Sequence, residues 1–229
     1  MTRIVNNCVA LVCLCLFWGQ SLRAADASHS EQIKWGNESV FNEEHNTLGL
    51  FSGVLGGQIV LAGGTSDDYS RWGRNAVCLS ENAGFALYED VLSKPLAYGA
   101  SITLSDGILC IGGRDSSQCY EDVFLVTMQQ GKLNVSEDWP PLPFPLSNAA
   151  GALLDNKVYL FGGRKSVSPS RLSDSFFVLD LSNKSRGWKE LPGYPGCVRE
   201  DAILVVQNNG VSPCLYLLGG QTETEEGLS

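Results

Sequence analysis

The sequence predicts an all-β fold, a β-propeller of four-stranded blades, and three observations carry this prediction. Four apolar runs each end on a pair of glycines: IVLAGG, ILCIGG, VYLFGG and LYLLGG. The first glycines of these pairs are Gly63, Gly112, Gly162 and Gly219. They lie 49, 50 and 57 residues apart, which is close to the spacing of kelch-type blades. After residue 24 no stretch shows a sustained helical period, whereas short runs rich in Val, Ile, Leu and aromatic residues alternate with turn residues.

Each repeat unit is expected to hold four strands. In the third unit these are residues 149–154, 157–161, 176–181 and 188–191, with Asp155-Asn156 as the first turn. In the second unit they are residues 98–104, 108–111, 122–128 and a weak strand before Trp139, and the outer strands of the first unit must lie within 75–92. Nine residues follow Gly220, too few for two more strands. We therefore expect about three and a half blades of a longer propeller in a truncated chain.

The N-terminus has the features of a secretory signal peptide. Arg3 precedes an apolar run at residues 9–18, and small residues follow at Ala24-Ala25. The run is too short to span a bilayer, so we expect cleavage, a periplasmic or secreted protein, and no membrane insertion. The expected segments are a signal peptide at 1–24, a segment at 25–47 in which EQIKWGN is a possible blade-closing strand, and blades at 48–94, 95–143, 144–195 and an incomplete 196–229.

Charge and composition exclude several partners and cofactors. The net charge is −9, and it becomes −11 when Arg3 and Arg23 of the leader are removed, which argues against nucleic acid and anionic membranes. Five cysteines follow the leader in no zinc-site spacing, and buried thiols are favoured over a disulfide framework. Only His29 and His45 remain as histidines, which argues against the copper centre of a kelch-type oxidase. We expect no metal and no cofactor.

Three stretches resemble a known family. They are PLAYGASITLSDGILCIGGRD at 95–115, PLSNAAGALLDNKVYLFGG at 145–163 and WKELPGYPGCVRED at 188–201. They are similar to the cyclically permuted mutarotase family, which are kelch-type propellers related to N-acetylneuraminate epimerase. The resemblance runs from about Leu48 to the end of the chain, and it implies a closed propeller of about six blades and the mutarotation of a sialic acid.

Candidate site residues lie where propeller ligands usually bind, at the mouth of the central channel. The starts of first strands and the loops after second strands converge there, and they supply Tyr98, Asn148, Arg199, Glu200, Arg114 and Arg164. Mutarotation needs a group that takes a proton from the anomeric hydroxyl and one that protonates the ring oxygen. We expect Arg199 to bind the substrate carboxylate, and Glu200 or an acid from the missing blades to handle the proton. Arg199 and Glu200 are the catalytic candidates, although neighbours in a regular strand point to opposite faces.

A second class of function stays open on the sequence alone. Many kelch propellers only bind a glycan or a protein, and one scaffold hosts both roles. The resemblance favours the carbohydrate mutarotase or epimerase acting on a small sugar, and the non-catalytic binding module is the alternative.

Overall fold

The structure is a computed structural model that describes residues 48–80, 84–224 and 227–228. The chain divides into two units, residues 1–38 and 39–229, and every described residue belongs to the second. The predicted signal peptide and the possible blade-closing strand lie outside the described residues. Among the described residues, no helix is long and apolar enough to cross a bilayer.

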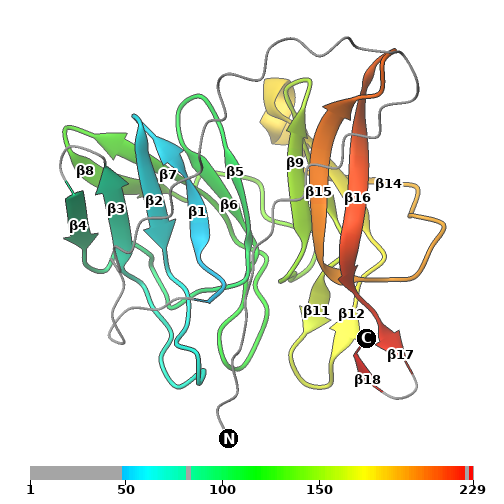
Figure 1. The fold of residues 1–229 in the computed structure, drawn as a ribbon, viewed down its shortest axis with the longest axis horizontal. Coiled ribbons are helices and arrows are strands. Elements are labelled where there is room, and N and C mark those ends of the chain that lie inside the picture. Colours follow the sequence, from blue (N-terminus) through cyan, green and yellow to red (C-terminus); the bar gives the residue numbers. More distant parts are fainter. Residues whose placement is uncertain (1–47, 81–83, 225–226, 229) are drawn as a thin grey trace, which may run out of the picture. The chain divides into compact units, whose positions relative to one another are not determined.

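Three antiparallel sheets of four strands form the body of the second unit (Figure 1). The first holds β1 (Phe51–Leu55), β2 (Gln58–Ala62), β3 (Ala76–Ser80) and β4 (Gly84–Tyr88). The second holds β5 (Ala100–Thr103), β6 (Ile108–Ile111), β7 (Val123–Gln129) and β8 (Lys132–Ser136). The third holds β9 (Ala150–Leu154), β10 (Lys157–Phe161), β13 (Phe176–Asp180) and β14 (Lys189–Leu191). These sheets confirm the propeller prediction, and the strands of the second and third units lie within about two residues of the expected ranges or inside them.

The fourth unit is a long hairpin, in which β15 (Glu200–Asn208) pairs with β16 (Pro213–Gln221). Smaller elements are the pairs β11 (Arg164–Ser166) with β12 (Arg171–Leu172) and β17 (Glu223–Thr224) with β18 (Gly227–Leu228), and the 3-10 helix η1 (Leu181–Arg186). No closed sheet is found in the part of the chain that the structure describes.

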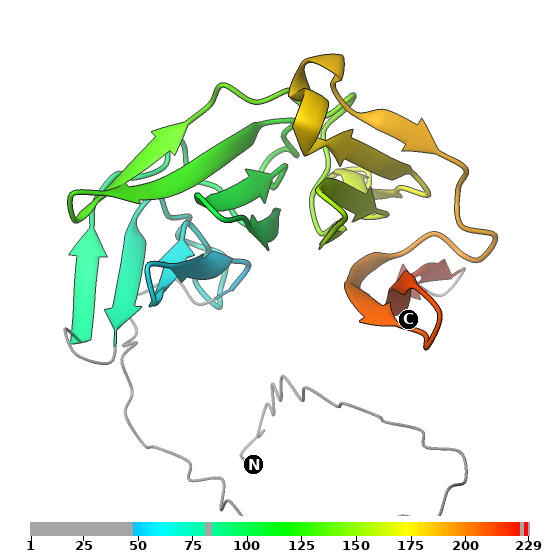
Figure 2. The same ribbon diagram turned by 90° about the horizontal axis from the view of Figure 1, so that it is seen from above.

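The first strands of successive units, β1, β5, β9 and β15, lie side by side and are innermost when the sheets are seen from above (Figure 2). Side chains tie neighbouring first strands together, as where the Ser52 backbone N–H donates to Ser101 Oγ at 3.0 Å. The apolar faces of adjacent sheets meet in cores between the blades, one around Phe51 and Phe124 and another around Leu160 and Phe177. The stack of sheets therefore positions one end of each inner strand next to the corresponding end of its neighbour.

The repeated glycine pairs are the points where one blade contacts the next. Gly162 has a φ of +66°, and a Cβ there would lie 2.4 Å from the carbonyl oxygen of Arg199 in the following unit. The next amide, of Gly163, donates to this same oxygen at 2.9 Å. The first pair makes the same contacts with the carbonyl oxygen of Leu96, and the second pair makes them with that of Leu146. Glycine is needed because only a residue without a side chain allows this close approach at positive φ.

All five described cysteines are free thiols. Cys78, Cys110 and Cys119 are buried, which agrees with the expectation of buried apolar side chains, whereas Cys214 is half-buried and Cys197 is exposed.

Candidate functional site

A row of residues in the left-handed backbone conformation marks one end of the inner strands. Gly49, Tyr98, Asn148 and Asp201 have φ values of 64°, 60°, 55° and 54°. Backbone hydrogen bonds join them: the N–H of Tyr98 donates to Gly49 O at 2.7 Å, that of Asn148 to Tyr98 O at 2.7 Å, and that of Asp201 to Asn148 O at 3.0 Å. Non-glycine residues rarely adopt positive φ, and such conformations cluster at functional sites. The fold thus gathers three polar side chains from three units.

The row lines an open groove of about 290 Å³. Its walls are Gly49, Leu50, Tyr98, Gly99, Asn148, Ala149, Asp201 and Ala202. Asn148 Nδ2 donates to Asp201 Oδ1 at 2.8 Å. Asn148 Oδ1 is buried and is the only buried side-chain oxygen or nitrogen without a hydrogen-bond partner among the described residues. A buried acceptor without a donor costs stability, so this atom is an unusual feature of the groove wall.

The Asp201 carboxyl is the unusual titrating group of this groove. Asp201 is exposed as a residue, but partial desolvation of its carboxyl group by the surrounding protein raises its pKa, and the negative charge of Glu200 acts in the same direction. The hydrogen bond from Asn148 opposes the shift without cancelling it. A carboxyl group with a raised pKa holds its proton more tightly, which favours a role in giving as well as taking a proton.

Arg114 lies over two aromatic rings beside the groove. Its guanidinium carbon is 4.7 Å from the ring centroid of Tyr98 and 5.1 Å from that of Trp72. Burial and the hydrogen bond to Tyr69 raise the pKa of Tyr98, so its hydroxyl stays protonated. The site therefore combines a stacked cation with a neutral phenol.

Two of the predicted residues bind each other instead of facing the groove as free groups. Arg164 Nε donates to Glu200 Oε2 at 2.7 Å, and its Nη2 contacts Glu200 Oε1. Arg164 Nη1 also donates to Ser170 Oγ at 2.9 Å. Glu200 is 3% exposed, and this bidentate pair joins β11 of the third unit to β15. The geometry assigns the pair a structural role between units, and the catalytic role of Glu200 stays a prediction.

Arg199 makes its contacts within the fourth unit. Its Nη1 donates to Gly219 O at 2.7 Å, and its guanidinium carbon lies 5.5 Å from the ring centroid of Tyr194. Within the described residues, the hydrogen bonds of the Arg199 side chain go to the backbone oxygens of Cys197 and Gly219, and not to the row of Tyr98, Asn148 and Asp201. Arg199 and Glu200 thus make separate contacts, consistent with the alternation of side chains along a strand.

Sequence reasoning missed Asp201, Tyr69 and Trp72. Alignment of the repeats contains the signal for Asp201, because LAYGA at 96–100, LSNAA at 146–150 and REDAI at 199–203 are equivalent in the row. Gly49, Tyr98 and Asn148 each lie 14 residues before the first glycine of their pair, whereas Asp201 lies 18 before Gly219. Because the β15–β16 hairpin is longer, counting back 14 residues from Gly219 does not lead to Asp201.

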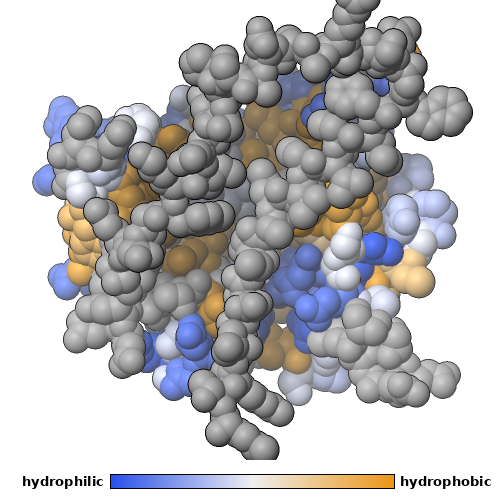
Figure 3. All heavy atoms as spheres, in the orientation of Figure 1, coloured by the Kyte–Doolittle hydropathy of each residue, from blue (hydrophilic) through white to orange (hydrophobic). Residues whose placement is uncertain are grey.

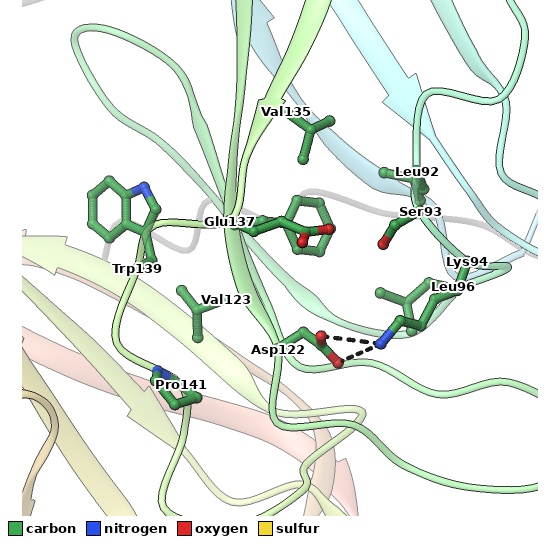
Figure 4. A pocket seen from close by; sticks show the side chains of 11 residues that line it. Leu92, Ser93, Lys94, Leu96, Asp122, Val123, Val135, Glu137, Trp139 and Pro141 are labelled. Carbon is green, nitrogen blue, oxygen red and sulfur yellow. Dashed lines mark hydrogen bonds and ion pairs between the residues drawn. The ribbon is translucent and has the colours of Figure 1, made fainter.

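A separate cavity of about 240 Å³ lies away from the row (Figure 4). Lys94 Nζ lies 3.0 Å from both carboxylate oxygens of Asp122 on its wall, and Trp139 and Glu137 also line it. None of the six predicted site residues lines this cavity. The row at the inner strands is therefore the better candidate site.

Comparison with known sequences identifies relatives over part of the chain. The Kelch motif matches residues 145–192. A protein of Vibrio cholerae named N-acetylneuraminate epimerase is 31% identical over 106 residues, which is 46% of this chain and 25% of that protein. A protein of the same name from Yersinia pestis is 32% identical over 89 residues, which is 39% of this chain and 20% of that protein. The matches thus span a quarter or less of the length of these relatives.

Comparison with solved structures supports the same fold. The structure titled "Structure of YjhT" matches with a TM-score of 0.57 and 10% sequence identity, over 79% of this chain and 68% of that one. At this identity the likeness concerns the fold alone.

Proposed function

Since the chain is a kelch-type relative of the N-acetylneuraminate epimerases, we propose that its site interconverts the anomers of a sialic acid by opening and reclosing the sugar ring. One observation carries this proposal: a carboxyl group with a raised pKa, Asp201, lies beside an unpartnered buried acceptor, Asn148 Oδ1, in an open groove. The predicted leader supports action in the periplasm or outside the cell.

The Asp201 carboxyl has the chemistry for both proton transfers. One carboxyl oxygen takes the proton of the anomeric hydroxyl while the other gives a proton to the ring oxygen. The bond between the anomeric carbon and the ring oxygen breaks, and the open-chain keto form results. Reversal of these steps on the other face of the carbonyl gives the second anomer. The raised pKa supports this role because it increases the fraction of the acid form that donates the proton.

Neighbouring groups in the row would hold the sugar for this step. Asn148 Oδ1 accepts a hydrogen bond from a sugar hydroxyl, and the Tyr98 hydroxyl, which donates its proton to Tyr69, can accept another. The Asn148 amide, which donates to Asp201 Oδ1 at 2.8 Å, keeps the carboxyl group oriented towards the groove. The sequence-based assignment of Arg199 and Glu200 is the competing proposal for the same chemistry.

Exchange between the α and β anomers of free N-acetylneuraminic acid, followed by NMR, tests the proposed function. We expect the folded chain to accelerate exchange over buffer, in proportion to protein concentration. If the anomers exchange at the buffer rate while the NMR lines of the sugar broaden on binding to the protein, the result would favour the non-catalytic glycan-binding alternative. Neither exchange nor binding by a chain with folded far-UV circular dichroism would contradict both functions.

A further inference from the structure

We infer that residues 65–72, the loop after β2, form together with Arg114 and Tyr98 a preformed subsite for the carboxylate of a sugar acid. In this subsite Trp72 and Tyr98 hold the guanidinium, and Tyr69 contacts the sugar. The inference rests on the proposed function for the identity of the sugar, and its geometry stands on the contacts of the loop.

The Arg114 guanidinium is held by ring stacking and has no carboxylate partner among the ion pairs of the described residues. These pairs are Arg74–Asp90, Lys94–Asp122 and Arg164–Glu200. The Arg114 side chain donates one long hydrogen bond, from Nη1 to Asp115 O at 3.4 Å. A guanidinium stacked on aromatic faces keeps its edge of N–H donors available, and that edge fits a carboxylate through two parallel hydrogen bonds.

The loop that carries Trp72 is fixed by its own polar side chains. Asp68 Oδ1 accepts from Ser66 Oγ at 2.6 Å and from the Ser70 N–H at 3.0 Å. Thr65 Oγ1 donates to Arg71 O at 2.7 Å, and Trp72 Nε1 donates to the backbone oxygen of the loop tip at 3.1 Å. The Trp72 ring is thereby ordered before any ligand arrives, which lowers the entropic cost of binding.

Tyr69 stands at the tip of this loop in a conformation that needs support. Its φ is +59°, and its side chain is 50% exposed. Its hydroxyl accepts from the Tyr98 hydroxyl at 3.4 Å, and its ring centroid lies 6.5 Å from that of Trp72. An exposed aromatic residue held at positive φ is a strained feature, and it presents both a hydroxyl and a ring face to a ligand.

The position of the subsite selects the class of sugar. The backbone of Asn148 is hydrogen-bonded to that of Tyr98, and the Asn148 side chain binds Asp201. Arg114, which lies over the Tyr98 ring, is therefore separated from the proton-handling carboxyl group of Asp201 by the width of two neighbouring units. In a 2-keto sugar acid the carboxylate is attached to the anomeric carbon itself. Such a sugar places its carboxylate near Arg114 when its anomeric carbon lies near Asp201. Neutral aldoses lack the anion, and uronic acids carry it on the carbon at the other side of the ring oxygen and not on the anomeric carbon.

Tryptophan fluorescence with a sugar that cannot mutarotate tests the subsite separately from catalysis. The probe is the 2-O-methyl glycoside of N-acetylneuraminic acid, and its methyl ester is the matched ligand without the carboxylate. We expect the acid to change the fluorescence of the wild type and of Trp139→Phe, but not of Trp72→Phe. Loss of the bidentate contact in Arg114→Ala should weaken binding about 10- to 100-fold. Arg74→Ala, which removes an outer arginine paired with Asp90, should bind like the wild type.

Equal affinity for the acid and its ester, unchanged affinity in Arg114→Ala, or no binding of the acid by the folded wild type would each overturn the subsite. If Arg114→Ala fails to fold, Arg114→Lys replaces it in the test. This variant keeps the positive charge but lacks the two parallel N–H donors, and it should bind the acid with intermediate affinity. Binding of the glycoside without exchange of the free sugar would support the subsite and overturn the proposed function. Exchange that is as fast in Arg114→Ala as in the wild type would support the function and overturn the subsite.

Discussion

The core between the second and third sheets and the hairpin β15–β16 are built from the same repeat, but they bury their apolar residues very differently. Leu160 and Phe177 in the third sheet are 0% and 1% exposed, because the second sheet covers them. Ile203 and Leu218 in the hairpin are 60% and 52% exposed. Figure 3 shows hydrophobic side chains at the surface among hydrophilic ones on the face it draws. A blade of this fold is thus stabilised mainly by its neighbours, and its own sheet buries little.

The glycine pairs show the same difference. A Cβ on Gly162 would lie 2.4 Å from Arg199 O, whereas a Cβ on Gly219 would meet nothing within 4 Å. Both glycines have positive φ, at 66° and 63°. The motif therefore encodes a contact with a following unit, and the first three units in the described chain make that contact.

The largest expected effect is on the buried side of this comparison. Phe177→Ala removes a side chain enclosed between two sheets, and it should lower the free energy of unfolding by about 3–5 kcal/mol. Leu218→Ala, on the exposed hairpin, should change it by about 0.5 kcal/mol or less. Urea unfolding followed by circular dichroism measures both. Equal losses would show that the hairpin is packed as tightly as the central sheets.

A smaller loss is expected from the ion pair that joins the two regions. Glu200→Gln leaves the Arg164 guanidinium without its carboxylate, which should cost about 1.5–3 kcal/mol in the free energy of unfolding. Glu190→Gln on the exposed face of β14 is the matched control and should be neutral. Hydrogen exchange should also become faster in β15 than in β10 in the Glu200 variant. A stability equal to that of the control would contradict a structural role of the pair.

The smallest effect is a difference in pH dependence between two aspartates. Burial by itself would raise the pKa of Asp115, but hydrogen bonds from Tyr120 and Ser117 lower it to about 2. Its contribution to stability is therefore present above the ordinary value of 3.8 and is lost as the pH falls through about 2. The contribution of Asp201 to stability has the opposite pH dependence, because its pKa is raised. This contribution is full below 3.8 and is lost as the pH rises through the folded-state pKa.

Asparagine variants separate these two contributions. Asp115→Asn should flatten the acid limb of the profile of urea midpoint against pH, and Asp201→Asn should flatten the decline above 3.8. Profiles in which both variants follow the wild type would contradict the two shifts.

The sequence was sufficient for the fold because the glycine pairs and the apolar runs depend on local geometry that repeats in each unit. It was insufficient for the site because side-chain partners lie in other units. Arg164 and Glu200 are 36 residues apart, and nothing in either segment indicates their pairing. Tyr98 and Asn148 were predicted from their place before the inner strands, and the structure places them in one groove. Asp201 was missed because the fourth hairpin is four residues longer than the others between this position and its glycine pair.

The most direct test of the central claim, that Asp201 handles the proton, is the rate of anomer exchange of N-acetylneuraminic acid in Asp201→Asn. Asp106→Asn, in an exposed turn of the second unit, is the matched control. General acid–base catalysis contributes about 10²- to 10⁴-fold, so the protein-dependent rate in Asp201→Asn should fall by at least about 100-fold, with binding of the locked glycoside retained. The control should keep the wild-type rate. An unchanged rate in folded Asp201→Asn would contradict the account and return the role to Glu200.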